Sequence, residues 1–272
     1  MRRILSDILL ILMFLGGIGL IAYPTVSNWW NQKHQSRVIV NYENAVNDMD
    51  EAAKVKMWKK ARRYNQKLSK YGALVSLSKS QKKQYNKLLD ITNNGIMGYI
   101  EIPVINVSLP IYHGTDEAVL QTAIGHIEGS SLPVGGKSSH CVISGHRGLP
   151  SARLFTDLDK MVKGDLFYLQ LLDHTLTYEV DSITVIEPTD LGRLRIYEGK
   201  DLCTLVTCTP YGINTHRLLV RGHRISNVTI DVPVEARQIN TMIVAAAYSV
   251  PIFTVIGIVL IVKHYRRRGR LI

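Results

Sequence analysis

Two long segments without charged residues, one near each end of the chain, restrict the fold more than any other feature of the sequence. Residues 8–32 carry no charge and are almost wholly apolar up to Ala22, and residues 241–262 are again uncharged, interrupted only by Pro251 and small polar residues. Each segment is long enough to cross a bilayer, which needs about 20 apolar residues. The sequence therefore predicts a first transmembrane helix within residues 1–32 and a second at 241–262.

A cleaved signal peptide is the alternative for the first segment, because Arg2 and Arg3 precede it. No small-residue cleavage motif follows the segment, and Tyr23-Pro24 stands where one is expected. A retained anchor is therefore favoured, with the neighbouring Trp29 suited to the interface of the lipid bilayer.

Basic residues flank both apolar segments on the sides that face the chain ends. Arg2 and Arg3 precede the first segment, and a basic tail at 263–272 follows the second. Because cytoplasmic flanks carry an excess of Lys and Arg, both ends are predicted to be cytoplasmic and the intervening residues extracellular. The formal net charge of +11 is then partly a consequence of topology, so it does not indicate nucleic-acid binding. We expect a multi-pass protein of the cell membrane.

Residues 33–94 have the pattern of an extracellular helical arm. Val38, Tyr42, Ala45, Met49 and Ala52 recur at spacings of three and four, which is typical of an amphipathic helix. Basic residues are concentrated between positions 54 and 87. They are interpreted either as a solvated helix face, which is favoured, or as a surface that meets anionic lipid headgroups or a wall polymer.

From residue 95 to 228 the pattern changes to short apolar runs separated by turn residues. Short strands at such spacing favour a mostly β fold, a closed or nearly closed β-barrel. The predicted strands are 99–103, 107–112, 140–144, 166–171, 176–180, 183–186, 204–208 and 218–220. Short helices are expected at 117–123 and 152–161, and residues 229–240 are expected to link the barrel to the second transmembrane helix.

A cysteine and an arginine occupy the ends of two neighbouring predicted strands. Cys208 ends one apolar run, and Arg217 begins the next after the loop around Pro210 and Gly212. A thiolate beside a fixed cation is a plausible nucleophile, and a guanidinium can donate two hydrogen bonds to a carbonyl oxygen that develops negative charge. Arg221 and Arg224 are alternatives, but Arg217 is nearest the loop.

A cysteine nucleophile needs a proton partner, and His146 is the favoured candidate. It follows the predicted strand at 140–144 and enters a glycine-containing loop, so it lies at a rim of the barrel, as Cys208 does. Alternation places it on the face of Val142 and Ser144, away from Cys141. The spacing alone leaves other candidates open: His113, His126, His140, His216 and His223.

The chain has three cysteines. Cys203 and Cys208 cannot form a disulfide within one strand, because about 3.3 Å per residue holds their backbones too far apart and alternation points them to opposite faces. A disulfide between Cys141 and Cys203 stays open, but two small buried thiols are favoured.

Other reactions lack their motifs in this sequence. Gly135-Gly136-Lys137-Ser138 resembles a phosphate-binding loop, but the first required glycine is replaced by Ser131. The sequence contains no H-E-x-x-H or C-x-x-C motif, so no metal and no cofactor are predicted. Residues 227–240 contain no LPxTG-like motif, which argues against a protein that is itself linked to a cell wall.

The motifs around these candidate residues resemble the sortases, and specifically the class C members that polymerise pilins. The resemblance runs from about residue 95 to 224, and its segments are SGHRGLP at 144–150, TLVTCTPYGINTHR at 204–217, MGYIEIP at 97–103, LPIYHG at 109–114, GHIEG at 125–129 and LFTDL at 154–158. The resemblance implies an eight-stranded sortase barrel and a transpeptidase. A second, C-terminal span is also similar to class C.

The resemblance also implies a role for each matched residue. Cys208 would attack the Thr–Gly carbonyl of an LPxTG-like sorting signal and form a thioacyl enzyme. His146 would donate and accept the proton, and Arg217 would orient the substrate and stabilise the oxyanion. A lysine amine of the next pilin subunit would then resolve the thioacyl enzyme. The alternatives are a sortase that attaches proteins to peptidoglycan and, from another class, a membrane-tethered binding module without turnover.

One departure from the class C pattern concerns the lid that covers the active-site cysteine. Many members carry an Asp-Pro-aromatic motif before the barrel, and the absence of proline between Pro24 and Pro103 excludes that motif here. The sequence therefore predicts that no acidic side chain from residues 65–95 contacts Cys208.

Overall fold

The computed structural model describes residues 2–71 and 76–227. The predicted linker at 229–240, the second apolar segment at 241–262 and the basic tail at 263–272 lie outside the described residues. The predictions for these three segments are therefore not tested by the structure.

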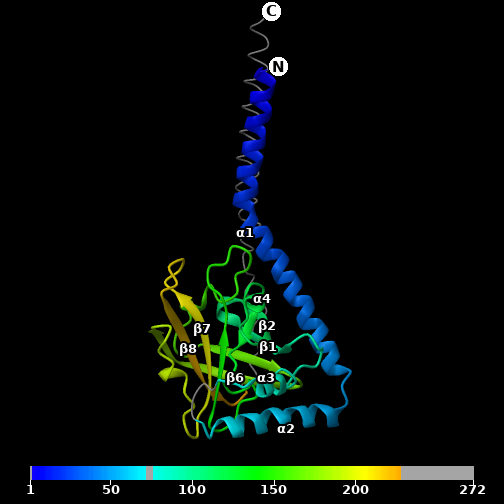
Figure 1. Cartoon of the computed structure of the whole chain (residues 1–272), viewed down its shortest axis with the longest axis vertical. Coiled ribbons are helices and arrows are strands. Elements are labelled where there is room, and N and C mark those ends of the chain that lie inside the picture. The colour runs from blue at the N-terminus through cyan, green and yellow to red at the C-terminus, as the bar shows by residue number, and fades with distance from the viewer. Residues whose placement is uncertain (1, 72–75, 228–272) are drawn as a thin grey trace, which may run out of the picture. The chain divides into compact units, whose positions relative to one another are not determined.

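The strands form a closed barrel of eight, as predicted, next to helices α1 and α2 (Figure 1). Around the barrel the strands are hydrogen-bonded in the order β1-β2-β3-β4-β7-β8-β6-β5. Their bounds are β1 Ile96–Ile102, β2 Val107–His113, β3 Ile124–His126, β4 Ser139–Ser144, β5 Leu166–Leu171, β6 His174–Ile186, β7 Asp201–Thr209 and β8 His216–Ile225. Neighbouring strands are antiparallel except for two parallel pairs, β2 with β3 and β4 with β7.

Two of the eight strands differ from those predicted. The predicted strands at 176–180 and 183–186 form one strand, β6, whose register with β8 shifts between Val180 and Ser182. A bulge of this kind bends a strand without ending its pairing, so the break in alternation was wrongly interpreted as a turn. Strand β3 was not predicted, because its three residues are too few to show alternation.

The helix predicted at 152–161 is wrong. The segment consists of turns followed by a short 3₁₀ helix, η2 (Leu158–Lys160). Leu154 has a φ of 35°, which an α-helix does not accommodate, and the Thr156 and Leu158 amides donate to carbonyls three residues earlier. The apolar residues of this segment are buried, as their spacing suggested, but without α-helical hydrogen bonding. The helix expected at 117–123 is shorter, α4 (Glu117–Leu120).

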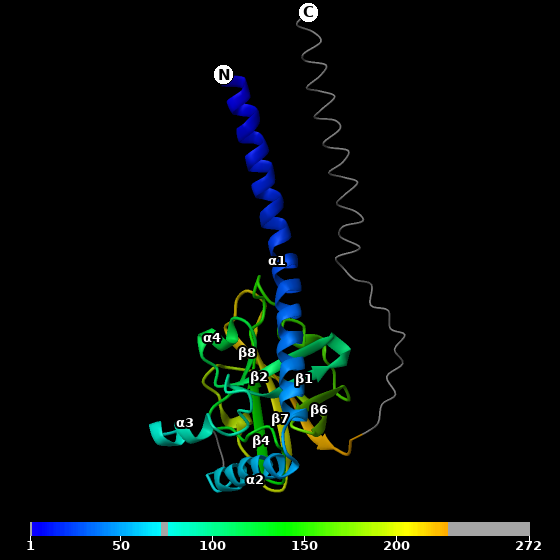
Figure 2. The same cartoon turned by 90° about the vertical axis from the view of Figure 1, so that its right-hand side faces the viewer.

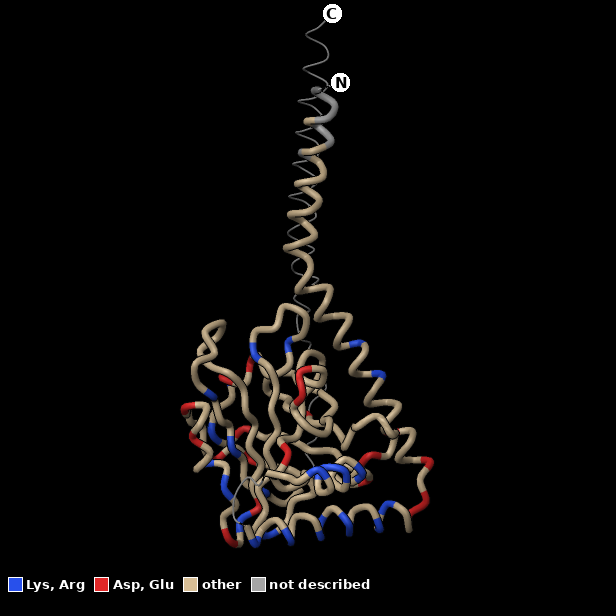
Figure 3. The backbone as a smooth tube through the Cα atoms, viewed as in Figure 1, with Lys and Arg blue, Asp and Glu red and all other residues tan. Residues whose placement is uncertain are grey.

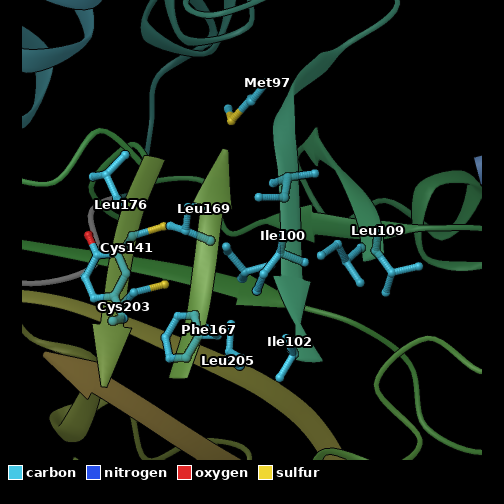
Figure 4. Close-up of a cluster of buried hydrophobic side chains, with 14 of the residues drawn as sticks. Met97, Ile100, Ile102, Leu109, Cys141, Phe167, Leu169, Leu176, Cys203 and Leu205 are labelled. Atoms are coloured by element: carbon cyan, nitrogen blue, oxygen red, sulfur yellow. The ribbon is translucent and has the colours of Figure 1, made fainter. Parts of the chain in front are cut away.

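The barrel interior is filled by apolar side chains that alternate along the strands (Figure 4). Cys141 of β4 and Cys203 of β7 are direct partners in the parallel register and lie side by side in this core. Both thiols are free and buried, so the favoured interpretation of two small core residues is confirmed. Burial raises the pKa of the Cys203 thiol well above its usual range, which keeps this thiol protonated.

Three helices precede the barrel: α1 (Arg2–Asn47), α2 (Glu51–Leu68) and α3 (Lys79–Tyr85). Residues Ile11–Asn47 of α1 are long and apolar enough to cross a membrane. The second half of α1 runs along the β1–β2 side of the barrel (Figure 2), where Tyr42, Val46 and Ile96 form a small apolar cluster. Short 3₁₀ helices also follow β1 and β6, namely η1 (Pro103–Ile105) and η3 (Gly192–Leu194).

Helix α2 packs Ala61 against the core of the barrel and is hydrogen-bonded to it through a buried amide side chain. Asn65 donates to the carbonyl of Leu132 at 2.9 Å and accepts from the Leu132 amide at 2.7 Å. Arg62, one turn earlier, donates to the carbonyl of Gly135 at 2.9 Å. The loop before β4 is thereby held against α2.

Candidate active site

Cys208 and Arg217 face each other across two antiparallel strands. In the register between β7 and β8, Cys208 is the direct partner of Arg217. Residues in this relation have Cβ atoms about 5 Å apart. The predicted position of the thiol and the guanidinium, at the facing ends of neighbouring strands, is therefore confirmed.

His146 lies on the other side of Cys208. Strands β4 and β7 are parallel, and their register ends with Ser144 opposite Val206. The contact continues beyond β4, because the Gly145 amide donates to the Val206 carbonyl at 3.1 Å and the Thr207 hydroxyl donates to the Gly145 carbonyl at 2.8 Å. Extension of this register beyond the end of β4 would bring His146 level with Cys208.

The three candidate residues lie on the outer face of the sheet, not in the barrel interior. Val142, Val206 and Leu219 form an apolar cluster separate from the core, together with Ile186 and Leu194. His146, Cys208 and Arg217 share their strand faces with these residues, because each lies an even number of positions from one of them. The site therefore has an apolar floor and three polar groups at one end of it.

The β7–β8 loop holds Arg217 from one side. Its Nη1 donates to the carbonyls of Asn214 and His216, at 3.1 and 3.0 Å. These two bonds use one nitrogen of the guanidinium, and no carboxylate in the described part of the chain forms an ion pair with Arg217. The remaining donors are thus not committed to a fixed anion.

The rival arginines are bound elsewhere. Arg221 lies four positions further along β8, about 13 Å from Arg217, and makes two hydrogen bonds to the carboxylate of Asp181. Arg224 donates to the carbonyl of Thr177 at 3.1 Å. Of the three arginines, only Arg217 is at the level of Cys208.

Several rival histidines are buried parts of the framework. His140 donates from Nδ1 to the Arg195 carbonyl and accepts at Nε2 from the Thr204 hydroxyl, both at 2.7 Å. Burial lowers its pKa to about 4, and the same cause lowers the pKa of His113. His126 has no exposed surface and bonds to Tyr85 at 2.8 Å.

The two remaining candidates are not paired with Cys208 in the register between β7 and β8. His216 is opposite Thr209, one position beyond Cys208, and its Nε2 is 3.0 Å from the carboxylate of Glu187. His223 is opposite Leu202, at the other end of β7. His146 is thus the histidine that the backbone register places beside Cys208.

Arg147 belongs to the same site, although the sequence did not single it out. Its Nη1 donates to the Thr209 hydroxyl at 3.2 Å, and its Nη2 pairs with Asp159 at 2.5 Å. The guanidinium also lies 5.9 Å from the centre of the Tyr211 ring. Only 10% of the Arg147 side chain is exposed. In the sequence, the position of Arg147 directly after His146 is the signal that could have revealed it. The partners of Arg147 become its neighbours only in the folded chain.

No lid carboxylate reaches the thiol. The single acidic residue between positions 65 and 95 is Asp90, and its Oδ1 accepts from the Gly95 amide at 3.0 Å. Among the described residues, no side chain forms a hydrogen bond with Cys208, and none of their His, Cys, Asp and Glu side chains form a group of three that could hold a metal ion. The described structure therefore contains no contact between Cys208 and an acidic residue of 65–95, the contact that would contradict the lid prediction.

Comparisons with known proteins agree with this geometry. Residues 100–225 match the sortase domain family. Sortase C1 from Streptococcus agalactiae is 53% identical, with 71% of this chain and all of that one covered and a TM-score of 0.69. Sortase C from Streptococcus pneumoniae is 46% identical, with 70% and 97% covered and a TM-score of 0.64.

A curated relative is more distant. Sortase D of Bacillus subtilis is 31% identical over 132 residues, which are 47% of this chain and 64% of that protein. Together with the near-complete coverage of the class C structures, these similarities establish the family. The chain belongs to the sortases, the cysteine transpeptidases, and its structural neighbours are of class C.

Proposed function

We propose that the chain is a membrane-anchored class C sortase that joins pilin subunits. The observation that carries the proposal is the pairing of Cys208 with Arg217 across β7 and β8, with His146 just beyond the end of the neighbouring strand β4. A nucleophile, a proton carrier and an oxyanion donor are the groups that acyl transfer from a peptide requires.

In the first half-reaction, the thiolate of Cys208 attacks the Thr–Gly carbonyl of an LPxTG-like sorting signal. Arg217 donates hydrogen bonds from its uncommitted nitrogens to the oxygen that becomes negatively charged. His146, as imidazolium, gives its proton to the departing glycine amine. The products are a thioacyl enzyme on Cys208 and the free C-terminal part of the signal.

In the second half-reaction, a lysine amine of the next pilin attacks the thioacyl carbonyl. His146, now neutral, takes a proton from the amine, and the Cys208 sulfur leaves as thiolate. An isopeptide bond joins the two subunits, and the enzyme returns to its starting protonation state.

The placement of the site suits a substrate that is still held in a membrane. The loop after His146 contacts α1 near its apolar half, because Ser27 and Asn31 both donate to the Ser151 carbonyl at 3.2 Å. In the proposed topology, residues 1–32 form the first anchor and 33–228 the extracellular arm and barrel. The segment at 241–262 crosses the membrane again, and 263–272 is cytoplasmic. The enzyme would lie on the outer face of a Gram-positive cell membrane.

The choice of pilins rests on the class C neighbours. The pneumococcal structure was described for what it reveals of catalysis and pilin substrate specificity. Attachment of surface proteins to peptidoglycan is the competing function, and relatives named sortase A match more weakly, at 31% identity for that of Staphylococcus aureus. The acceptor amine distinguishes the two functions.

The test is a joining assay with a fluorescent sorting-signal peptide and two acceptors, a pilin domain and a peptidoglycan cross-bridge peptide. Cys208→Ala should abolish joining, and His146→Ala and Arg217→Ala should each lower kcat/KM by about 100-fold or more while circular dichroism stays unchanged. His174→Ala and Arg193→Ala, at exposed sites, are the matched controls. Full joining by Cys208→Ala would refute the proposal that the chain is a cysteine transpeptidase. Joining to the cross-bridge peptide alone would refute the proposal that a pilin amine is the acceptor.

A further inference from the structure

Helix α2 is rich in basic residues (Figure 3), and five of them form a row on the side of the helix opposite its buried residues. This basic row consists of Lys56, Lys59, Lys60, Arg63 and Lys67, and all five are exposed. At 100° per residue they fall within an arc of about 100°. The buried residues of α2, which include Ala61, Asn65 and Leu68, lie on the opposite side. The row is therefore one continuous strip, not a scatter of charges.

The basic row has no acidic counterpart. No Asp or Glu occurs between Lys54 and Lys87. Within the described residues, the ion pairs of this region involve Lys54 with Glu51 and Lys82 with Glu128, and none involves the basic row. Arg62 points instead to the Gly135 carbonyl.

Such a row disfavours the helix that carries it. Like charges three and four positions apart repel each other, and the row contains several such pairs, for example Lys56 with Lys60 and Arg63 with Lys67. The helix is held in spite of this by its docking through Asn65 and Leu132. A ligand that supplies negative charge along the strip would remove the repulsion.

We propose that the basic row is a binding site for a linear phosphodiester polymer, of the poly(glycerol phosphate) kind found in cell walls. From Lys56 to Lys67 the strip is about 16 Å long, at 1.5 Å per residue. A chain of regularly spaced phosphates can lie along this length and meet each cation in turn. Lysine ammonium groups bind phosphates as point charges and tolerate a flexible partner.

The composition of the row favours such a polymer over other polyanions. Protein interfaces are enriched in aromatic residues and depleted in lysine at their centre, and the row is the reverse. Single-stranded nucleic acids are bound with aromatic side chains on which bases stack, and the row contains none. A partner recognised by its backbone charge alone fits the strip best.

The position of the row favours a wall polymer over lipid headgroups. This step rests on the extracellular placement proposed above. From Trp30 to the end of α1 at Asn47 the helix extends about 25 Å, and α2 begins only after that point. Charges are screened over about 8 Å at physiological salt, so the row lies well beyond the field of the bilayer surface.

The experiment measures binding of fluorescent poly(glycerol phosphate) to the full chain in phosphatidylcholine nanodiscs. The variant Lys56→Gln, Lys59→Gln, Lys60→Gln and Arg63→Gln is compared with a control of equal charge change, Lys33→Gln, Lys163→Gln, Arg193→Gln and Lys200→Gln, at exposed sites outside the row. We expect the row variant to lose at least about tenfold in affinity at low salt, and its slope of log K against log salt to become shallower by about 3. The control should stay within about threefold of the wild type.

Two further measurements identify the source of the negative charge. Phosphatidylglycerol vesicles and a single-stranded oligonucleotide replace the polymer as probes, and the proposal expects the polymer to bind most tightly. Equal loss of polymer binding in both variants, or row-dependent binding to the vesicles or the oligonucleotide alone, would overturn the proposal. Cleavage of a soluble sorting peptide should be unchanged in the row variant, and because binding is measured without turnover, a failed assay of joining would leave this test intact.

Discussion

At the residue scale, Arg147 links the loop that carries His146 to the end of the strand that carries Cys208. It binds Thr209 of β7 and Asp159 of the connection before β5, and little of its side chain is exposed. Because it touches neither Cys208 nor His146 by a hydrogen bond, its effect would be through position. A shift of about 1 Å in reacting groups can cost about 100-fold in rate.

We therefore expect Arg147→Met to lower kcat of peptide joining by about 10- to 100-fold, with KM changed by less than about threefold. Arg147→Lys should restore part of the loss, because one ammonium can reach only one of the two partners. Steady-state kinetics checks this. Arg153→Met, which breaks the exposed ion pair with Asp157 in the same connection, is the control. An equal loss of kcat in the control would remove the assigned role from Arg147.

Cys208 and Arg217 were predicted from local sequence, His146 was favoured by its spacing and assigned through the resemblance to the sortases, and Arg147 was not predicted. Cys208 and Arg217 are separated by one short loop, so strand alternation and turn residues placed them opposite each other. His146 is more than 60 positions away and was favoured by its place after a strand. The position of Arg147 depends on contacts with Asp159 and Tyr211, and the spacing of apolar residues along the sequence does not predict such contacts.

At the element scale, the connection between β6 and β7 is fastened to the sheet by His140. Its Nδ1–H donates to the Arg195 carbonyl, and its Nε2 accepts from Thr204. The bond that Nε2 accepts needs the neutral imidazole, because a protonated ring carries a hydrogen on both nitrogens. Burial lowers the pKa of His140 most, and the positive charge of Arg221 lowers it further. The hydrogen bond to the Arg195 carbonyl and the carboxylate of Asp181 raise it, and the resulting pKa is about 4.

This depressed pKa makes stability depend on pH in a known direction. In the unfolded chain the pKa of His140 is about 6.5, so between pH 6.5 and 4 the unfolded state binds more protons. The stabilisation is complete above pH 6.5 and is lost as the pH falls towards 4. From pH 7 to 5 the loss amounts to about 2 kcal/mol.

We expect His140→Gln to be less stable than the wild type at pH 7 and to lose about 2 kcal/mol less between pH 7 and 5. Urea unfolding of the detergent-solubilised chain, followed by tryptophan fluorescence, measures both values. The depressed pKa of His113 contributes to both proteins and cancels in the difference. His174→Gln, at an exposed site, should keep the pH dependence of the wild type. Parallel pH profiles for wild type and His140→Gln would contradict the assignment.

The strands and helices were predictable where a single hydrophobic pattern continued along the whole segment. Strands β1, β2, β4, β5, β7 and β8 were all found, because each has a run of apolar residues bounded by turn residues. The misses have local causes: three residues in β3 are too short to show a period, and a bulge interrupts that of β6. In 152–161 the helical spacing was present, but the positive φ of Leu154 prevents a helix.

At the scale of the whole molecule, α1 belongs to both the proposed anchor and the catalytic unit. Its apolar half includes the residues suited to a membrane, and its second half is bonded to the barrel as far as Glu43. The Tyr42 hydroxyl donates to the Met97 carbonyl and accepts from the Leu172 amide, both at 2.9 Å. Burial raises the pKa of this phenol to about 12, so it stays a donor under all ordinary conditions.

Removal of that hydroxyl should weaken the joint between helix and barrel. In Tyr42→Phe the buried Met97 carbonyl and Leu172 amide lose a shared partner, which costs about 1–3 kcal/mol. In a domain of this size each kcal/mol lowers Tm by about 2–4 °C. We expect a fall of about 3–10 °C in a thermal melt of the detergent-solubilised chain.

The same joint predicts where the chain can be shortened. Removal of residues 1–24 leaves every contact of α1 from Ser27 to Tyr42 in place, so Tm should change by less than about 2 °C. Removal of residues 1–47 exposes the β1–β2 side of the barrel and should lower Tm by more than Tyr42→Phe does. Tyr71→Phe, with 73% of the side chain exposed, is the control for the loss of a phenol. If Tyr42→Phe and Tyr71→Phe melted together, or if both truncations kept the Tm of the full chain, α1 would be an anchor alone and not a structural part of the enzyme.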